Sequence, residues 1–411
     1  MTFLDYHDYK RFLVLNLIYH SGAISRTGLT ELTGYMPAVI GSIVKDLISE
    51  KLIVETGSIY SGQGRRRTLL EINHRQICAI GVSISSDSIY YIVSTIRGDM
   101  LRSFTQTISN NASSNEIIQT LIDTLKQLLA EFSNRQILGI GISDPGIMDP
   151  TEEFSIQSVR FQNWNNVHIK EIVERETGLP VRITTRHALV ALAEQNFGAA
   201  QNMSDFVCLE LSVGIGLSFA CNGMVVKGHS AMAGEIGHTL VHTNDAVCYC
   251  GNVGCIEQST AWPCIKERLE DACRRGVQTC LNTICNDLRK LTIADVRYAL
   301  DRNDRLCTRI VQESGELIGI ALANVINLLN PECVIFNGDM VQLGDVFLDE
   351  IKRSASRHIM PYFSGITYTI SPLMENALPI GAATLFFREF LKSENFQWLS
   401  GLPVEGDLTR E

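Results

Sequence analysis

A histidine followed by three closely spaced cysteines is the strongest chemical pattern in the sequence. Nine residues separate His238 from Cys248, Cys250 follows two positions later, and two glycines precede Cys255. Zn²⁺ prefers thiolate and imidazole ligands and binds four of them in a tetrahedral structural site. Because four protein ligands leave no place for a metal-bound water, we expect structural rather than hydrolytic zinc. The alternative is ordinary buried cysteines, but the glycines lie where a metal-binding loop must bend.

The other cysteines show no such clustering. Twelve cysteines in 411 residues are too few for a disulfide scaffold. We therefore expect reduced, inert packing residues at Cys264, Cys273, Cys280, Cys285 and Cys307.

The N-terminal residues predict helices joined by a short turn. Residues 8–20 carry apolar side chains at helical spacing, namely Phe12, Leu15, Ile18 and Tyr19. Ser25 is a suitable N-cap for a short helix through Thr33, and Gly34 then breaks the chain. Pro37 fits the first turn of the next helix. Two helices joined in this way form a helix-turn-helix signature.

The helix expected over about 37–50 has two different faces. One is apolar and consists of Val39, Ile40, Ile43, Val44, Leu47 and Ile48. The other has small or cationic residues, which suit a helix lying against a DNA groove: Ala38, Gly41, Ser42 and Lys45.

A β-hairpin wing is expected next, from two apolar segments around a turn-rich stretch. The wing carries Arg65, Arg66 and Arg67 at its tip. Alone, three arginines in a loop favour a solvated surface. Together with the preceding helix pair, they favour a winged helix-turn-helix DNA-binding domain over residues 1–75.

The rest of the chain is predicted to be an α/β protein, because expected strands alternate with expected helices. Expected strands are 77–84, 88–95, 135–142, two around a glycine turn from Phe206, and 333–337, and expected helices are about 114–132, 314–329 and 379–392. They suggest two similar lobes with a cleft between them. The first spans 76–200 plus about 379–395, and the second spans 201–378 with the zinc motif.

Composition narrows the possible functions. The chain is 45% hydrophobic with a net charge of -10, so it can bury large cores and is not a disordered protein. Residues 1–75 hold nine Lys/Arg against seven Asp/Glu, which makes them the plausible DNA-binding part. The sequence has no signal-peptide pattern and no apolar stretch of membrane-spanning length, so we expect a cytoplasmic protein.

Several motifs resemble the ROK family of repressors, open reading frames and sugar kinases. The main signature lies in residues 233–238 (AGEIGH) and 248–257 (CYCGNVGCIE). Further family-like segments are 144–147, 163–165, 214–216, 330–332 and 381–383. Residues 8–73 resemble the winged helix-turn-helix of the repressor branch, which includes xylose and N-acetylglucosamine repressors. The resemblance implies a two-lobed actin-like fold of the sugar kinase and Hsp70-like ATPase type, a homodimer or homotetramer, and a sugar in the cleft.

The kinase residues of the family are poorly matched. ATP-dependent members carry Asp-x-Gly-Gly-Thr where this chain has residues 83–87 (SISSD), and Val213 replaces a threonine before Gly-x-Gly. The family's catalytic Asn-Asp pair corresponds to Thr185 and Arg186, counting back from residues 193–194. A guanidinium cannot accept the proton of a sugar hydroxyl, so we expect no kinase activity and no catalytic residue.

The resemblance assigns sugar contacts to Glu235, His238 and Glu257. Alternatively, the two glutamates only orient the zinc ligands. Arg186, with His187 beside it, suggests an anionic ligand such as a sugar acid or sugar phosphate. The other possibility is that Arg186 pairs with a nearby acid and fills the pocket, which would leave no ligand.

These inferences predict a DNA-binding transcriptional regulator, specifically a repressor of carbohydrate-related genes with a zinc-containing, kinase-inactive, sugar-sensing domain. One rival is a ROK sugar kinase with a DNA-binding arm. Another is a regulator controlled by a protein partner instead of a sugar.

Overall fold

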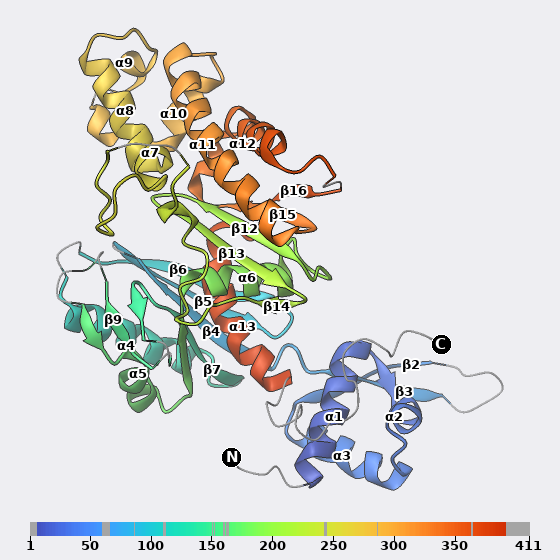
Figure 1. Cartoon of the computed structure of the whole chain (residues 1–411). Coiled ribbons are helices and arrows are strands. Elements are labelled where there is room, and N and C mark those ends of the chain that lie inside the picture. The colour runs from blue at the N-terminus through green and yellow to red at the C-terminus, as the bar shows by residue number, and fades with distance from the viewer. Residues whose placement is uncertain are drawn as a thin grey trace. The chain divides into compact units, whose positions relative to one another are not determined.

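The computed structural model describes residues 6–59, 66–85, 87–109, 112–149, 151, 153–158, 161, 164–241, 245–285, 287–362 and 365–391. The chain divides into two compact units. The first consists of residues 1–142, 159–183 and 382–411, and the second of residues 143–158 and 184–381. Figure 1 labels their helices and strands.

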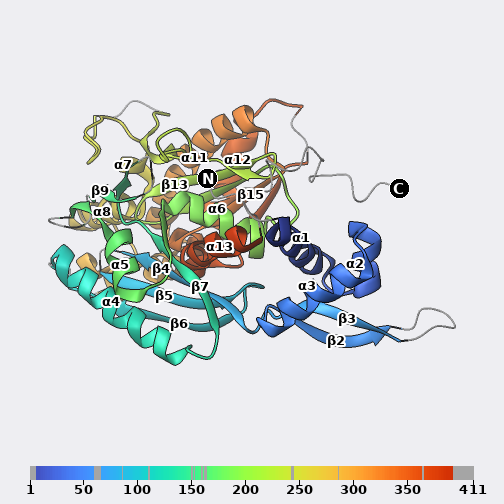
Figure 2. The same cartoon turned by 90° about the horizontal axis from the view of Figure 1, so that it is seen from below.

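The N-terminal part of the first unit is a winged helix-turn-helix. Its helices are α1 (Tyr6–Ser21), α2 (Arg26–Thr33) and α3 (Pro37–Ser49), and its strands are β1 (Ile24–Ser25), β2 (Ile53–Ile59) and β3 (Arg67–Ile72). The strands form an antiparallel sheet in the order β1-β3-β2. Figure 2 shows the hairpin of β2 and β3 extending beyond the three helices.

The turn between α2 and α3 has the local chemistry that the sequence predicts. The Ser25 hydroxyl accepts a hydrogen bond from the Gly28 N–H at 3.1 Å and so caps α2. Gly34 ends α2 with a φ of 68°, a left-handed conformation that glycine adopts without strain. Pro37 begins α3, where its missing N–H costs no hydrogen bond. These three residues fix where one helix stops and the next begins.

A five-stranded sheet forms the core of the first lobe. Its order is β11-β7-β4-β5-β6. The strands are β4 (Ile77–Ile84), β5 (Ser88–Thr95), β6 (Met100–Thr107), β7 (Gln136–Ser143) and β11 (Val181–Thr184), and the helices are α4 (Ser114–Glu131), α5 (Ile169–Thr177) and α13 (Ala377–Leu391). A Cβ on Gly141 would lie 1.9 Å from the Ala382 carbonyl oxygen, so glycine lets α13 approach β7 closely. Three further short strands lie between β7 and β11 in the sequence: β8 (Ile147–Met148), β9 (Ser155–Gln157) and β10 (Asn165–Val167).

The second unit repeats this sheet order as β14-β13-β12-β15-β16. Its strands are β12 (Phe206–Leu211), β13 (Ile215–Cys221), β14 (Met224–Val225), β15 (Cys333–Asn337) and β16 (Thr367–Ile370). β12 pairs antiparallel with β13 and parallel with β15, which in turn pairs parallel with β16. In the first sheet β4, β5 and β6 form a meander, and β7 pairs with the other edge of β4. In the second sheet β12, β13 and β14 form the meander, and β15 pairs with the other edge of β12. The expectation of two similar α/β lobes, each opening with a hairpin, is confirmed.

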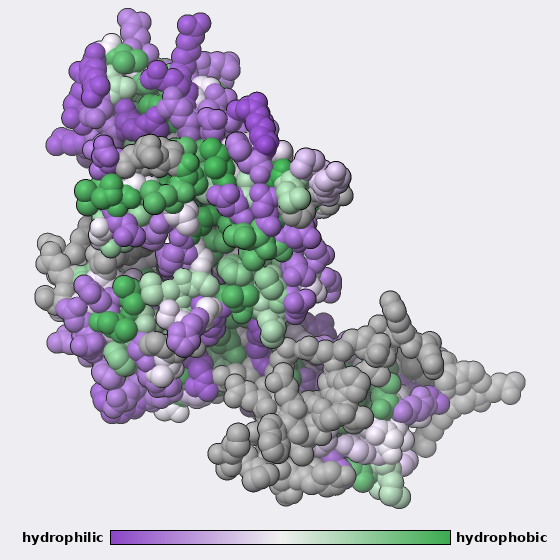
Figure 3. All heavy atoms as spheres, in the orientation of Figure 1, coloured by the Kyte–Doolittle hydropathy of each residue, from purple (hydrophilic) through white to green (hydrophobic). Residues whose placement is uncertain are grey.

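Helices pack around the second sheet and bury a large apolar core. They are α6 (Arg186–Phe197), α7 (Glu257–Thr260), α8 (Trp262–Arg274), α9 (Leu281–Ile284), α10 (Ile293–Leu300), α11 (Arg305–Leu329) and α12 (Asp345–His358). Short 3₁₀ turns occur at Ile236–His238, Leu288–Lys290, Asp339–Leu343 and Met374–Asn376. The outer surface over α8 to α10 is mostly hydrophilic (Figure 3).

Two boundaries differ from the sequence expectations. α11 begins at Arg305 rather than near 314, because Asp304 accepts hydrogen bonds from the N–H groups of Leu306 and Cys307 and caps the helix. The chain passes from the first unit to the second between Ile183 and Thr184 rather than at residue 200. Helix α6 therefore belongs to the second unit, because it packs against β13. None of the described helices is long and apolar enough to span a membrane.

Candidate functional site

The exposed face of α3 is the one that the sequence assigns to DNA. Ala38, Ser42 and Lys45 are exposed, and nothing lies within 4 Å of a Cβ built on Gly41. The opposite face is buried and consists of Ile40, Ile43, Val44 and Leu47. A helix with one buried face and one smooth, partly cationic face can approach a DNA groove closely.

The expected hairpin wing is also present. β2 and β3 pair antiparallel, with Ile59 opposite Arg67 at the far end of the ladder. Arg66 is exposed and Arg67 is half-buried, whereas Arg65 lies outside the described residues. The structure therefore places two of the three arginines at the end of the described part of the wing.

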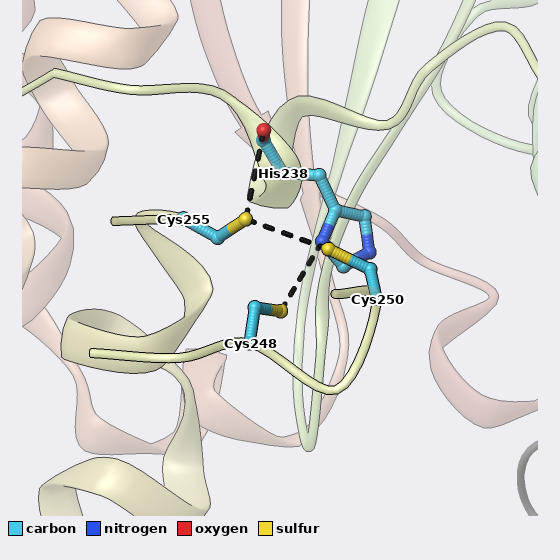
Figure 4. Close-up of side chains that lie close together, drawn as sticks. All are labelled: His238, Cys248, Cys250 and Cys255. Atoms are coloured by element: carbon cyan, nitrogen blue, oxygen red, sulfur yellow. Dashed lines mark hydrogen bonds between the residues drawn. The ribbon is translucent and has the colours of Figure 1, made fainter. Parts of the chain in front are cut away.

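The four expected zinc ligands come together in the second unit (Figure 4). The ligand atoms of His238, Cys248, Cys250 and Cys255 all lie within 4.8 Å of one another. His238 Nδ1 is 3.6 Å from Cys248 Sγ, and the sulfurs of Cys250 and Cys255 are 3.7 Å apart. A tetrahedron built with ordinary Zn–S and Zn–N bonds has edges of about 3.6 to 3.8 Å. The arrangement therefore fits Zn²⁺ without further movement of these pairs.

The loop around the cysteines is folded tightly enough to hold this arrangement. The Cys248 N–H donates to the Asn252 carbonyl at 2.8 Å, and the Gly251 N–H donates to the Cys248 carbonyl at 2.9 Å. Gly251 and Gly254 have φ values of 91° and 86°, so the two bends require glycine. These are the glycines that the spacing of the motif placed at the bends.

The surroundings of the sulfurs also suit a metal. The Gln258 amide donates to Cys248 Sγ at 3.5 Å, an outer contact of the kind that stabilises a metal-bound thiolate. Burial, together with the neighbouring thiols, raises the pKa of Cys255 to about 12. A metal must therefore displace a proton from this thiol, so its affinity for the site should increase with pH.

Glu235 lies between two histidines. Its carboxylate oxygens are 3.7 Å from His187 Nε2 and 3.7 Å from His238 Nε2. The nearby His187 imidazole lowers the pKa of Glu235, which keeps the carboxylate ionised. Since Nδ1 of His238 faces Cys248, its Nε2 is left to face Glu235.

Glu257 approaches the same region from the start of α7. Its side chain is buried, and one carboxylate oxygen accepts a hydrogen bond from the Ile215 N–H at 2.8 Å. Glu257 is therefore fixed at the end of β13. It can present its second oxygen to a hydroxyl group while the first remains satisfied by the backbone.

Arg186 has a specific partner. At the N-terminus of α6, its guanidinium donates to Glu210 on β12 at 2.7 Å, and both side chains are largely buried. Of the alternative stated above, the structure shows the ion pair of Arg186 with a nearby acid. The positive charge is compensated within the protein, which weakens the case for an anionic ligand.

The Gly-x-Gly segment at the start of β13 also has a structural explanation. A Cβ on Gly214 would lie 2.9 Å from a Glu257 oxygen, and one on Gly216 would lie 2.4 Å from the His187 ring. Both glycines therefore allow side chains of the site to approach the backbone. Their presence does not by itself indicate a phosphate-binding loop.

Comparison with known proteins places this architecture in one family. The family model "ROK family" matches residues 79–389, most of the chain. The chain belongs to the ROK family. A curated relative, the xylose repressor of Caldicellulosiruptor bescii, is 28% identical over 385 residues, which cover 93% of this chain and 96% of the relative.

Two solved ROK structures show how the fold is shared. A ROK family transcriptional regulator, a homologue of the Escherichia coli MLC protein, matches with a TM-score of 0.81 and 24% identity, over 94% of this chain and 97% of its own. A ROK glucokinase from Streptomyces griseus matches with a TM-score of 0.64 and 23% identity, over 75% of this chain and 98% of its own. The expected α/β, actin-like fold with an N-terminal winged helix-turn-helix is confirmed.

Sequence reasoning missed two residues that contact predicted site residues of the ROK domain. Glu210, the partner of Arg186, lies 24 positions away and has no motif to mark it. Tyr249 occupies the variable position between two cysteines, yet its hydroxyl is 3.2 Å from His238 Nε2. Its place inside the zinc motif was the available signal.

Proposed function

We propose that this protein is a cytoplasmic transcriptional repressor of carbohydrate-related genes, with a structural-zinc domain that senses a sugar. The observation that carries this proposal is the winged helix-turn-helix, with its smooth α3 face, in the same chain as a ROK domain. The full-length similarity to a xylose repressor supports it. In addition, the family resemblance suggests that the repressor binds its operator as a homodimer or homotetramer.

We also propose that the ROK domain does not phosphorylate sugars. Arg186 stands where the kinases of the family are expected to carry the catalytic acid, and its charge is paired with Glu210. A guanidinium keeps its proton and cannot accept another from a sugar hydroxyl. The Glu210 carboxylate, which could accept one, is already paired with Arg186.

A coupled assay with ATP, Mg²⁺ and a panel of neutral sugars should detect no sugar phosphate above background. A ROK glucokinase in the same assay provides the positive control. Formation of sugar phosphate by the purified protein, abolished by ligand-site substitutions such as Glu235→Gln, would contradict the proposal and support the sugar kinase with a DNA-binding arm.

The ligand that fits the site best is a neutral sugar. Glu235, His238 and Glu257 offer hydrogen-bond groups suited to hydroxyls. The Arg186 guanidinium is paired with Glu210, and His187 lies close to Glu235. We therefore propose that these residues orient the sugar in addition to supporting the zinc ligands.

Calorimetry with xylose, N-acetylglucosamine and N-acetylglucosamine 6-phosphate should show at least equal affinity for the neutral forms. The Glu210→Gln variant, which frees the Arg186 charge, should shift the preference toward the phosphate by roughly three- to tenfold. A strong phosphate preference in the wild type would restore the anionic-ligand hypothesis. No binding to any sugar would favour control by a protein partner.

A further inference from the structure

Tyr249 lies in the zinc motif, but none of the functions proposed above involves its side chain. It lies between Cys248 and Cys250, and its ring stands edge-on to the His238 imidazole, with ring centres 5.4 Å apart and an interplanar angle of 81°. Its hydroxyl is 3.2 Å from His238 Nε2, the ring nitrogen opposite the one that faces Cys248. The hydroxyl therefore contacts the face of His238 that we assign to the sugar.

The carboxylate of Glu257 lies in the neighbourhood of this hydroxyl. Burial raises the pKa of Tyr249, and the nearby Glu257 carboxylate raises it further, so the hydroxyl keeps its proton. When Nδ1 of His238 binds a metal, Nε2 carries the hydrogen and can donate it to the tyrosine oxygen. The phenolic hydroxyl thus occupies the outer ring nitrogen of one proposed sugar contact and lies near a second.

A sugar hydroxyl offers the same chemistry, since it both donates and accepts a hydrogen bond. We propose that the Tyr249 hydroxyl stands in for a ligand hydroxyl at Nε2 of His238, and that a neutral sugar must displace it to bind. The inference rests on the proposed sugar-sensing function. It adds that Tyr249 lowers the affinity for the effector and so sets the sugar concentration at which the repressor responds.

The local structure allows this displacement. Tyr249 is 62% exposed, so its side chain can rotate into solvent. Its two neighbours are proposed zinc ligands, and the turn is closed by the Gly251-to-Cys248 backbone hydrogen bond. With the backbone held in this way, the movement is a side-chain rotation that leaves the metal site intact.

The test compares the zinc-loaded, full-length wild type with Tyr249→Phe, which removes only the hydroxyl. Tyr362→Phe is the matched control, because Tyr362 lies in the same unit and is 89% exposed. Calorimetry would use xylose, glucose, mannose and N-acetylglucosamine. Zinc content and melting temperature should be equal in all three proteins.

Tyr249→Phe should bind its best sugar roughly fivefold more tightly than the wild type, the effect of losing one competing hydrogen-bonded group. Tyr362→Phe should match the wild type. Unchanged or weaker binding by Tyr249→Phe would overturn the proposal, since the tyrosine would then be neutral or part of the binding surface. Absence of sugar binding in all three would overturn it as well, whereas retained operator binding in that case would leave the DNA-binding function standing.

Discussion

Replacement of Cys255 by serine should remove bound zinc and destabilise the second unit. The wild type should carry about one zinc per chain, and the variant close to none. Cys255 is buried, and its sulfur faces Cys250 at 3.7 Å, so its loss leaves an incomplete ligand set around a tight loop. Because structural zinc contributes directly to folding free energy, we expect a loss of about 3 kcal/mol or more, with weaker repression.

The control for this experiment is Cys273→Ser, which changes a half-buried cysteine outside the metal group. It should keep its zinc and stay near the wild-type melting temperature. The zinc content and the melting temperature should be measured for the wild type and for both variants. Less than half a zinc per chain in wild type purified without chelator, or full zinc in Cys255→Ser, would show that the site is not the metal centre.

Removal of the wing arginines should weaken DNA binding and also reduce its dependence on salt. The change is Arg65→Ala, Arg66→Ala and Arg67→Ala together. Each lost phosphate contact should lower the slope of log affinity against log salt by about 0.9, and thus by up to about 3 for the three arginines. If the wing enters a minor groove, the loss should be greatest where that groove is narrow and A·T-rich.

A matched control removes three arginines from the exposed surface of the second unit: Arg274, Arg275 and Arg289. This triple variant changes the net charge equally, so it separates local contact from general electrostatics. Its salt slope should equal that of the wild type. An unchanged slope in the wing variant, measured by titration at several salt concentrations, would show that the wing does not touch DNA.

Local signals explain the parts of the structure that the sequence predicted well. Ser25, Gly34 and Pro37 each act within a few residues, so helix ends could be placed from the sequence alone. The zinc group was equally accessible, because three of its ligands lie within eight residues and His238 lies just upstream. The wing was visible from its flanking strands, although Arg65 lies outside the described residues.

Contacts between distant segments account for what was missed. The Arg186–Glu210 ion pair joins α6 to β12, and neither residue belongs to a repeating pattern. The inclusion of α6 in the second unit likewise depends on its packing against β13, which no local periodicity reveals. Tyr249 was overlooked because its contact with His238 depends on how the loop folds, although its place inside the zinc motif was a signal.

Genome-wide mapping of occupied DNA tests the central claim most directly. The wild type would be compared with Ser42→Glu/Lys45→Glu, which adds negative charge to the exposed face of α3 and leaves its buried face unchanged. We predict discrete sites near carbohydrate-related genes for the wild type, and their loss in the variant despite equal zinc content and stability. No enriched sites for the wild type, or the same sites for both proteins, would contradict the account.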